Sequence, residues 1–290
     1  MRIDYATIMF QKLRSLLSRS SAPSAPFQVL SDLHLEINQQ YPSFEIPVCA
    51  NSLILAGDVG RLADYDRYLE FLQKQTERFE IVFLVLGNHE FYKESFTMGL
   101  EKAKQLEREP SLNGRLILLH QRRYDIPDSH VTILGCTLWS KVPNEARDIV
   151  KSKIQDFRQI QDWTVDDHNA AHDADHAWLL REIQSICEEN QKLRKQDQPR
   201  TILVVTHHAP SLRKTSSPRN ENNPWSCAFG TDLLSHAAVG VKVWVFGHTH
   251  YTTEFVYRGT SVVSNQRGYV LGGESEKTRK GFDAGKVIYV

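Results

Sequence analysis

The segment Val243-Trp244-Val245-Phe246-Gly247-His248-Thr249-His250 joins an apolar run to a glycine and to two histidines one residue apart. The apolar run predicts a buried β-strand that ends at Gly247. On an extended backbone, residues i and i+2 point to the same side, so we expect the imidazoles of His248 and His250 to converge. Converging imidazoles commonly share a metal ion, although histidines are also frequent in loops after strands. The pair therefore predicts metal chemistry only if other strand ends carry matching ligands.

Four further predicted strands end in polar residues of this kind. The segments that follow them are Ser31-Asp32-Leu33-His34, Gly57-Asp58-Val59-Gly60, Gly87-Asn88-His89-Glu90 and Thr206-His207-His208. In open α/β sheets, ligands bind at the carboxyl ends of the strands, and glycines such as Gly57, Gly87 and Gly247 allow sharp turns there. We therefore expect five strands to deliver carboxylates, an amide and imidazoles to one end of a sheet.

The donor types in these segments restrict the metal. Carboxylates, an amide oxygen and imidazoles without a thiolate suit manganese, iron or zinc better than they suit a cysteine-rich structural zinc site. The donors are too many for one tetrahedral ion, whereas two ions about 3.5 to 4 Å apart, bridged by a shared carboxylate, would use them all. Taken singly, Asp32 or Asp58 could be a helix cap, Asn88 a turn residue and His207 a buried structural histidine. The ordered set of five strand ends favours the metal site.

From Phe27 onward, apolar strands alternate with helical stretches, which is typical of an α/β protein. The predicted strands are residues 27–30, 52–56, 81–86, 115–119, 131–136, 202–205, 243–246, 254–257, 261–264 and 286–290. Apolar residues recur at helical spacing around residues 65–72, 96–106 and 178–186. Because the early strands are continuous apolar runs and the late ones alternate more, we expect a mixed sandwich rather than one open sheet, in a single domain over residues 27–290.

Two regions depart from this alternation. Residues 140–199 carry few strand signals and a long helical pattern, so we expect a helical cap inserted into the sandwich. Residues 1–26 combine apolar residues at helical spacing with basic ones and end in Ser21-Ala22-Pro23-Ser24-Ala25-Pro26. They predict a basic amphipathic leader followed by a linker, because proline cannot extend a helix. This leader loosely resembles a mitochondrial presequence, so a mitochondrial localisation is the alternative to a cytoplasmic one.

The composition is that of an ordinary globular protein. The 290 residues are 41% hydrophobic and include 35 basic and 35 acidic residues. This charge balance does not favour broad binding to nucleic acids or to anionic membranes. Four cysteines, Cys49, Cys136, Cys187 and Cys227, lie far apart without a Cys-x-x-Cys pair, so we expect a reducing environment rather than a zinc finger or a disulfide framework. No apolar run is long enough to predict a transmembrane helix.

The ordered motifs Asp-x-His, Gly-Asp, Gly-Asn-His-Glu, Thr-His-His and Gly-His-Thr-His, between Asp32 and His250, are similar to those of the calcineurin-like metallophosphoesterase superfamily. The resemblance implies an α/β fold with four α/β/β/α layers, the double β-sandwich of metallo-dependent phosphatases. It also implies two divalent metal ions, here manganese, iron or zinc. The first ion would be held by Asp32, His34, Asp58 and His250, and the second by Asn88, His207, His248 and the bridging Asp58.

The resemblance further implies a hydrolase that cleaves a phosphoester with a hydroxide activated between the two metals. Asp58, Asn88 and His89 would be the catalytic residues, with His89 contacting the phosphate or protonating the leaving oxygen. We expect the substrate to be a small or medium phosphorylated metabolite. A nuclease or a protein phosphatase shares this site, but the neutral charge disfavours the first and a capped pocket the second. A non-catalytic scaffold of the same fold is the alternative from another class, and the filled ligand positions disfavour it.

Arg61 departs from the family pattern Gly-Asp-x-x-Asp, whose last aspartate pairs with the histidine that corresponds to His89. Without that partner, the contribution of His89 as a general acid would be weakened, and the enzyme would prefer aryl phosphates, phosphodiesters or activated esters over simple alkyl monoesters. Alternatively, Arg61 binds a substrate phosphate through its guanidinium group. His208, which neighbours a ligand, and Arg267, in a turn near the end of the chain, are further candidates for substrate binding.

Two weaker features complete the set of candidates. The loop at residues 211–229 is long enough to be a substrate lid. His168, His172 and His176 would stack on one face of a helix beside Asp173 and Asp175. That arrangement suits a third metal site or, more simply, a solvated helix face or a lining of the cap.

Overall fold

The computed structural model describes residues 25–194, 197–271 and 281–290. The amphipathic leader expected for residues 1–26 lies outside these ranges except for its last two residues, so it stays a prediction. Within the described ranges, no helix combines the length and the apolar character that crossing a membrane requires.

The first sheet has the strand order β11-β1-β2-β3-β4. Its strands are β1 (Pro26–Leu30), β2 (Ser52–Ala56), β3 (Ile81–Val85), β4 (Leu116–Leu118) and β11 (Val287–Tyr289). Strands β1 to β4 are parallel, whereas β11 pairs antiparallel with β1 and forms the edge. The continuous apolar runs of β2 and β3 suit their central position, because central parallel strands are buried on both faces.

The second sheet has the strand order β5-β6-β7-β8-β10-β9. Its strands are β5 (Arg122–Asp125), β6 (Val131–Cys136), β7 (Thr201–Thr206), β8 (Val241–Phe246), β9 (Glu254–Tyr257) and β10 (Thr260–Ser264). The four central strands are parallel, and the edge strands β5 and β9 pair antiparallel with their neighbours. The sequence does not predict β5, because its polar Arg-Arg-Tyr-Asp run lies half-buried at an edge.

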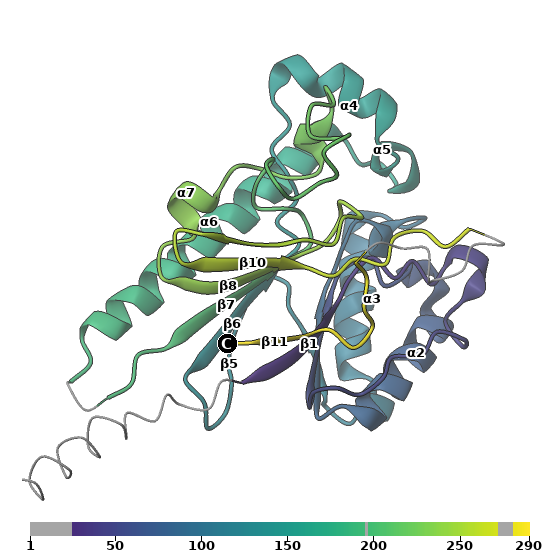
Figure 1. Cartoon of the computed structure of the whole chain (residues 1–290). Helices are drawn as coiled ribbons and strands as arrows, with labels where there is room; N and C mark the ends of the chain where they lie inside the picture. The colour runs from purple at the N-terminus through teal and green to yellow at the C-terminus, as the bar shows by residue number, and fades with distance from the viewer. Residues whose placement is uncertain (1–24, 195–196, 272–280) are drawn as a thin grey trace, which may run out of the picture.

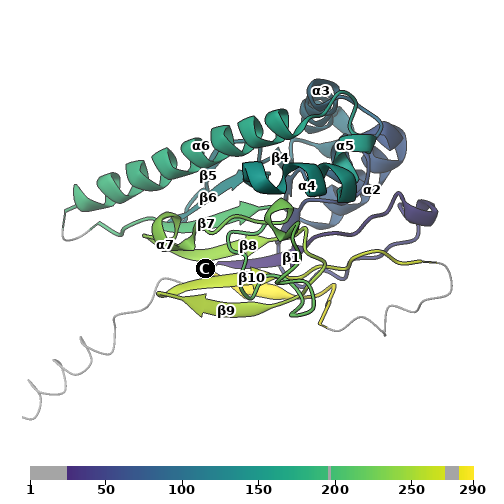
Figure 2. The ribbon, with the colours of Figure 1, turned by 90° about the horizontal axis from the view of Figure 1, so that it is seen from above.

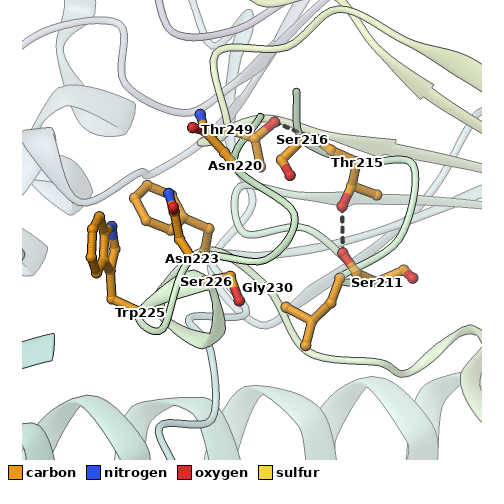
Figure 3. Close-up of a pocket in the computed structure, with 11 residues that line it drawn as sticks. Ser211, Thr215, Ser216, Asn220, Asn223, Trp225, Ser226, Gly230 and Thr249 are labelled. Carbon is orange, nitrogen blue, oxygen red and sulfur yellow. Dashed lines mark hydrogen bonds between the residues drawn. The ribbon is translucent and has the colours of Figure 1, made fainter. Parts of the chain in front are cut away.

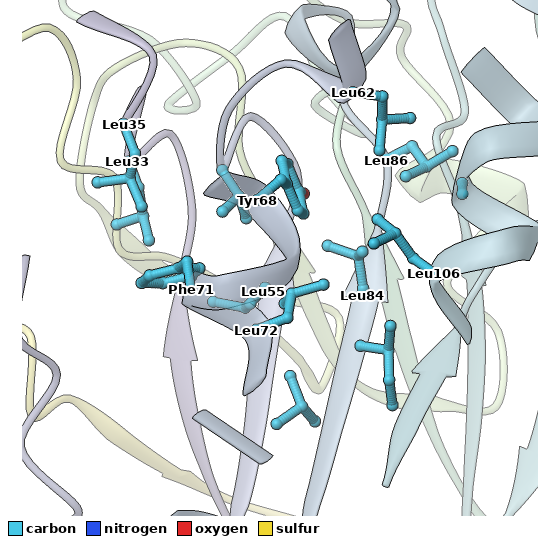
Figure 4. Packing of buried hydrophobic residues seen from close by; sticks show 14 of the residues in the cluster. Leu33, Leu35, Leu55, Leu62, Tyr68, Phe71, Leu72, Leu84, Leu86 and Leu106 are labelled. Atoms are coloured by element: carbon cyan, nitrogen blue, oxygen red, sulfur yellow. The ribbon is translucent and has the colours of Figure 1, made fainter. Parts of the chain in front are cut away.

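Helices cover the outer faces of both sheets, as Figures 1 and 2 show. Helices α2 (Tyr65–Arg78) and α3 (Phe96–Arg108) lie on the first sheet, where Phe71 and Leu72 of α2 pack with Leu55 and Leu84 (Figure 4). Helices α6 (Val165–Gln191) and α7 (Leu234–Ala237) lie on the second sheet. Between the sheets, inward-facing valines, isoleucines and phenylalanines from both form a third apolar cluster. The predicted α/β/β/α sandwich is therefore confirmed.

The region 140–199 is helical, as the sequence predicts, but a separate cap is not confirmed. It contains α4 (Arg147–Lys153), α5 (Asp156–Gln159) and α6. Most of its length is α6, whose Leu179 and Ile183 pack against Trp244 of the second sheet, so α6 is an outer layer of the sandwich. Helices α4 and α5 and the N-terminal end of α6 stand near the carboxyl ends of the strands (Figure 1). The short 3₁₀ helices are η1 (Ile37–Gln39), η2 (Leu62–Asp64), η3 (His89–Phe91), η4 (Pro110–Leu112), η5 (Asn144–Ala146) and η6 (Ser226–Ala228).

Candidate metal centre

The loops after β1, β2, β3, β7 and β8 meet at one end of the sandwich and are joined by hydrogen bonds. The Asp32 backbone N–H donates to the Gly57 carbonyl at 3.0 Å, which links the loops after β1 and β2. The His248 N–H donates to the Asp32 carboxylate at 2.9 Å, which links the first sheet to the second. All seven side chains predicted as metal ligands meet here: Asp32, His34, Asp58, Asn88, His207, His248 and His250. All are buried except His250.

The seven side chains form two adjacent groups. In the first, the ligand atoms of Asp32, His34 and His250 all lie within 4.8 Å of one another. In it, the Nε2 atoms of His34 and His250 are 2.9 Å apart. The second group contains Asp58 and two further histidines, whose ligand atoms lie within the same limit. Asp58 Oδ2 is 3.8 Å from His34 Nε2, so its carboxylate stands between the groups.

The second group consists of Asp58, His207, His248 and Asn88. His207 Nε2 lies 3.4 Å from Asp58 Oδ2 and 3.1 Å from Asn88 Oδ1. Asn88 is oriented by Asp156, whose Oδ1 accepts a hydrogen bond from the Asn88 Nδ2 at 2.8 Å. The amide oxygen of Asn88 is thereby turned towards the group, as a metal ligand requires.

His248 and His250 therefore fall in different groups, as the resemblance implies, and the expectation that two neighbouring rings share one metal is wrong. Its premise of an extended strand is also wrong. His248 has a φ of 71° and His250 a φ of 50°, so both lie in the left-handed region just beyond β8. The strand ends at Phe246, and the two residues take loop conformations that direct their rings to different ligand groups.

The left-handed backbone recurs at five of the seven ligand positions: Asp32 (φ 54°), His34 (φ 48°), Asp58 (φ 53°), His248 and His250. For a residue other than glycine, this conformation costs about 1–3 kcal/mol and persists only where the surroundings enforce it. Here the interloop hydrogen bonds enforce it. Such strain concentrates at functional sites, so the backbone marks the same residues as the motifs do.

The protonation of the ligands suits a cation. Burial lowers the pKa of His34, His248 and His250, so these imidazoles are neutral and keep a lone pair for a metal. Burial would also lower the pKa of His207, but the Asp58 and Asp32 carboxylates raise it to about 10. His207 Nδ1 donates to the Ala56 carbonyl at 2.9 Å, so its Nε2 faces two oxygen acceptors. The space between Nε2 and these two oxygens requires a positive charge, which is either a proton or a metal ion. The donor set of the whole site fits two divalent ions.

Glu90, the last residue of the Gly-Asn-His-Glu motif, holds the loops in place. Its buried carboxylate accepts hydrogen bonds from the backbone N–H groups of Asp58 at 2.9 Å, Val59 at 2.8 Å and Gly87 at 2.6 Å. Gly87 leaves no room for a side chain, since a Cβ atom there would lie 2.2 Å from Asp58 Oδ1. The motif thus fixes the bridging ligand through both its glutamate and its glycine.

His89 has a carboxylate partner that the sequence does not predict. Its Nδ1 lies 2.8 Å from Glu36 Oε1, its Nε2 lies 3.1 Å from the Tyr269 hydroxyl, and its ring stacks on Tyr92 with centroids 4.1 Å apart. Burial lowers the pKa of His89, but the Asp58 charge and the Glu36 hydrogen bond outweigh it and raise the pKa to about 9. Glu36 Oε1 also lies 3.5 Å from His34 Nδ1, so one carboxylate orients both rings.

The two roles considered for Arg61 are not supported. Its guanidinium binds Asp64, with Nη2 and Nε at 2.9 and 3.2 Å from Oδ2, and its N–H donates to the Tyr41 hydroxyl. It does not line the cavity at the metal centre. The expectation that His89 lacks a carboxylate partner is also wrong, because Glu36, four residues after Asp32, supplies that carboxylate.

Arg267 and His208 do not line the cavity at the metal centre either. Arg267 is 5% exposed, donates to the Leu33 carbonyl at 3.0 Å, and stacks on Phe44 with 4.3 Å between the guanidinium and the ring centroid. His208 is fully buried behind the ligand His248, with ring centroids 4.0 Å apart. Both side chains support the loops from the protein interior, where neither reaches the cavity.

A cavity of about 310 Å³ opens onto the metal centre. Asp58, Asn88, His89, His248 and His250 line it, as do several residues without a sequence signal: Tyr92, Lys153, Asp156 and Tyr269. Tyr92 comes shortly after the Gly-Asn-His-Glu motif, and this position is the one sequence signal that could have predicted its place in the cavity. Lys153 and Asp156 come from α4 and α5, outside every motif.

The three histidines at helical spacing in α6 do not form a solvated face. His168 and His172 are buried, with His168 Nε2 3.1 Å from the Ser140 hydroxyl and His172 Nδ1 donating to the Leu138 carbonyl at 2.9 Å. Neither they nor His176 belong to a possible metal-binding group within the described residues. His168 and His172 thereby anchor α6 to the loop after β6.

The fold and the site together define the class of protein. The family model for calcineurin-like phosphoesterases matches residues 25–252, and the chain belongs to this family. Its membership supports phosphoester hydrolysis, and the motifs that carry the resemblance in the sequence all lie within the matched range.

Two similar proteins extend over nearly the same length. The chain is 27% identical over 262 residues to the protein L509 of Acanthamoeba polyphaga mimivirus, described as uncharacterised, and the match covers 83% of this chain and 90% of that protein. Among solved structures, it is similar to the phosphopantetheinyl hydrolase PptH of Mycobacterium tuberculosis, with a TM-score of 0.60 and 18% identity. That likeness covers 92% of this chain and 96% of the other, and it shows a shared fold.

Proposed function

We propose that this chain hydrolyses the phosphoester of a small or medium metabolite with two divalent metal ions as cofactors. The observation that carries the proposal is the position of Asp58, whose carboxylate faces ligand atoms of both groups. Asp32, His34 and His250 would hold the first ion, and His207, His248 and Asn88 the second. Bound there, the ions would supply Lewis acidity and lower the pKa of water towards about 7.

His89 would donate a proton to the substrate. Its Nδ1 is held by Glu36, which leaves Nε2 directed at the cavity, where the Tyr269 hydroxyl is its partner. Against the effect of burial, the Asp58 charge and the Glu36 hydrogen bond raise the pKa of this ring to about 9, which favours its protonated form. It can therefore contact a phosphoryl oxygen or protonate the leaving oxygen at Nε2.

The Glu36 contact changes the substrate preference that we propose. Because His89 has its carboxylate, there is no structural reason to restrict the enzyme to good leaving groups. Alkyl monoesters are then substrates as well as aryl esters. The cavity of about 310 Å³ and the nearby Lys153 suit a small phosphorylated molecule better than a protein or a nucleic-acid strand.

Metal analysis and a substrate panel test this proposal. The purified chain would be analysed for bound metal and then assayed with manganese, zinc or iron on an aryl monoester, an aryl diester and an alkyl monoester. A phosphopantetheinyl ester belongs in the panel because of the shared fold with PptH. Hydrolysis of the alkyl monoester is expected. Two bound ions without hydrolysis of any ester would favour the non-catalytic scaffold.

The Asp58→Asn variant tests the shared ligand. It should abolish hydrolysis and lower the metal content, because both groups lose the charge between them. Asp66→Asn is a matched control, since Asp66 is an exposed aspartate on α2. Normal turnover by Asp58→Asn would refute the two-metal site. His168→Ala is unsuitable as a silent control, because His168 is fully buried.

A further inference from the structure

A second cavity, of about 280 Å³, lies beside the metal centre and is formed mainly by the loop between β7 and β8 (Figure 3). Asn220, Phe229 and Thr249 line both this cavity and the one at the metal centre. Thr249 stands between the candidate ligands His248 and His250 in the chain. A molecule with its phosphorus at the metal centre can therefore extend directly into the second cavity.

The second cavity is chemically unlike the first. The metal cavity is lined by charged groups that include Asp58, Lys153 and Asp156. Among the described residues that line the second cavity, none has an ionisable side chain. Its polar lining consists of hydroxyl and amide groups, and its aromatic lining consists of Trp225 and Phe229. We call it the neutral cavity.

One side of the neutral cavity is fixed by internal hydrogen bonds. The Thr249 hydroxyl donates to the Thr215 carbonyl at 2.6 Å, the Thr215 hydroxyl donates to the Ser211 carbonyl, and the Ser211 hydroxyl donates to Asp232 at 2.9 Å. Figure 3 shows Ser211 and Thr215 on this side, away from Trp225. These three hydroxyls are already used, so they supply shape rather than free donors.

The opposite side offers unused polar groups. The side-chain amides of Asn220 and Asn223 and the hydroxyl of Ser226 have no hydrogen-bond partner in the part of the chain that the structure describes. Asn223 and Ser226 lie next to Trp225, and Asn220 lies beside Thr249 (Figure 3). The Trp225 ring is itself contacted by Lys153, whose Nζ lies 5.5 Å from the ring centroid. An aromatic surface flanked by free amides suits a ligand with both apolar and hydrogen-bonding parts.

We propose that the neutral cavity binds the alcohol part of the phosphoester, and that this part is an uncharged chain carrying amide or hydroxyl groups. The inference rests on the proposed phosphoester hydrolysis. None of the described residues that line this cavity is a cation, so a second phosphate or a carboxylate at this end of the substrate would find no charged partner among them, and burying an unpaired charge is unfavourable. The substrate then has one charged end, at the metals, and one neutral end, against Trp225.

Matched probes separate these two ends. The first is the phosphate monoester of N-acetyl-6-aminohexanol, which has a neutral amide chain. The second is hexane-1,6-diol bisphosphate, which has a similar length and a second charge. Inorganic phosphate, as a competitive inhibitor, reports on the metal centre alone. The wild-type kcat/KM should be at least about tenfold higher for the amide ester, and a preference for the bisphosphate would overturn the inference.

Substitutions in the neutral cavity give the second test. Trp225→Ala should raise KM for the amide ester about tenfold and leave the inhibition constant of inorganic phosphate unchanged. Asn223→Lys should shift the preference towards the bisphosphate, because it places a cation in the cavity. Asn222→Lys is the control, since Asn222 is exposed and does not line the cavity. An unchanged KM in Trp225→Ala would refute the assignment.

The test also distinguishes the two levels of inference. If neither ester is hydrolysed with any metal, the proposed function fails, and the neutral cavity is judged by calorimetric binding of the amide ester. Trp225→Ala must then weaken that binding about tenfold, or the inference fails as well. If both esters are hydrolysed but Trp225→Ala affects neither, the function stands and only the assignment of the neutral cavity is wrong.

Discussion

Glu36→Gln isolates the charge that holds His89. The variant keeps an oxygen that can accept from His89 Nδ1, now at 2.8 Å from Glu36 Oε1, but it removes the negative charge. A hydrogen bond with an ionised partner is roughly twice as strong as a neutral one, so the change removes about 1 to 1.5 kcal/mol. That energy corresponds to about a tenfold change in the equilibrium that keeps His89 protonated. We expect the alkaline limb of the pH profile of kcat for an alkyl monoester to move down by about one pH unit, so that kcat above that limb falls about tenfold.

The leaving group provides the internal comparison. Glycerol phosphate needs a proton on its departing oxygen, whereas p-nitrophenolate leaves without one, so kcat for p-nitrophenyl phosphate should change less than about twofold. Both rates would be measured at saturating metal, since Glu36 also approaches His34. Glu70→Gln, at an exposed position on α2, is the control. Equal losses for both esters, or no loss for glycerol phosphate, would refute the role of Glu36 in proton donation.

Three further predictions concern the supports of the site and the stability of the fold. Asp156→Ala should weaken metal binding about 10- to 100-fold, seen by titration calorimetry, because it frees the Asn88 amide to rotate; unchanged affinity would contradict this. Gly87→Ala should yield a folded chain, by circular dichroism, that retains little metal, because the new Cβ displaces Asp58. Burial raises the pKa of Asp175 to about 6 from its ordinary 3.8, so the folded state binds this proton more tightly and loses about 3 kcal/mol as the pH rises from about 4 to 6. Urea unfolding should show the stability difference between wild type and Asp175→Asn changing over that interval and levelling above it.

The sequence predicts the sandwich and the candidate metal-ligating residues well, because both produce short local sequence patterns. Each central strand is an uninterrupted apolar run that ends in a glycine or a polar ligand, so the strand and its functional residue are read together. This pattern does not predict strand β5. Its half-buried edge segment, Arg122–Asp125, has the composition of a loop. The separate cap was predicted because helical periodicity shows that α6 forms but does not show what it packs against.

The supporting residues could not be predicted because their partners are distant in the chain. Glu36 meets His89 across 53 residues, and Asp156 meets Asn88 across 68. An arginine in a turn, such as Arg267, suggests an exposed side chain until Phe44 is placed beneath its guanidinium. These roles depend on tertiary contacts, which no spacing along the sequence encodes.

The left-handed backbone at five ligand positions also limits how the site can evolve. Apart from glycine, the residues that adopt this conformation most readily are asparagine, aspartate and histidine. These are also the oxygen and nitrogen donors that manganese, iron and zinc accept. Exchange among the three can retune the metal preference while the loops keep their shape. A β-branched residue or another poor left-handed former at Asp32, Asp58 or His248 would have to overcome the backbone as well as supply a donor. The backbone conformation of the loops thus limits which residue types can serve as ligands when the metal specificity changes.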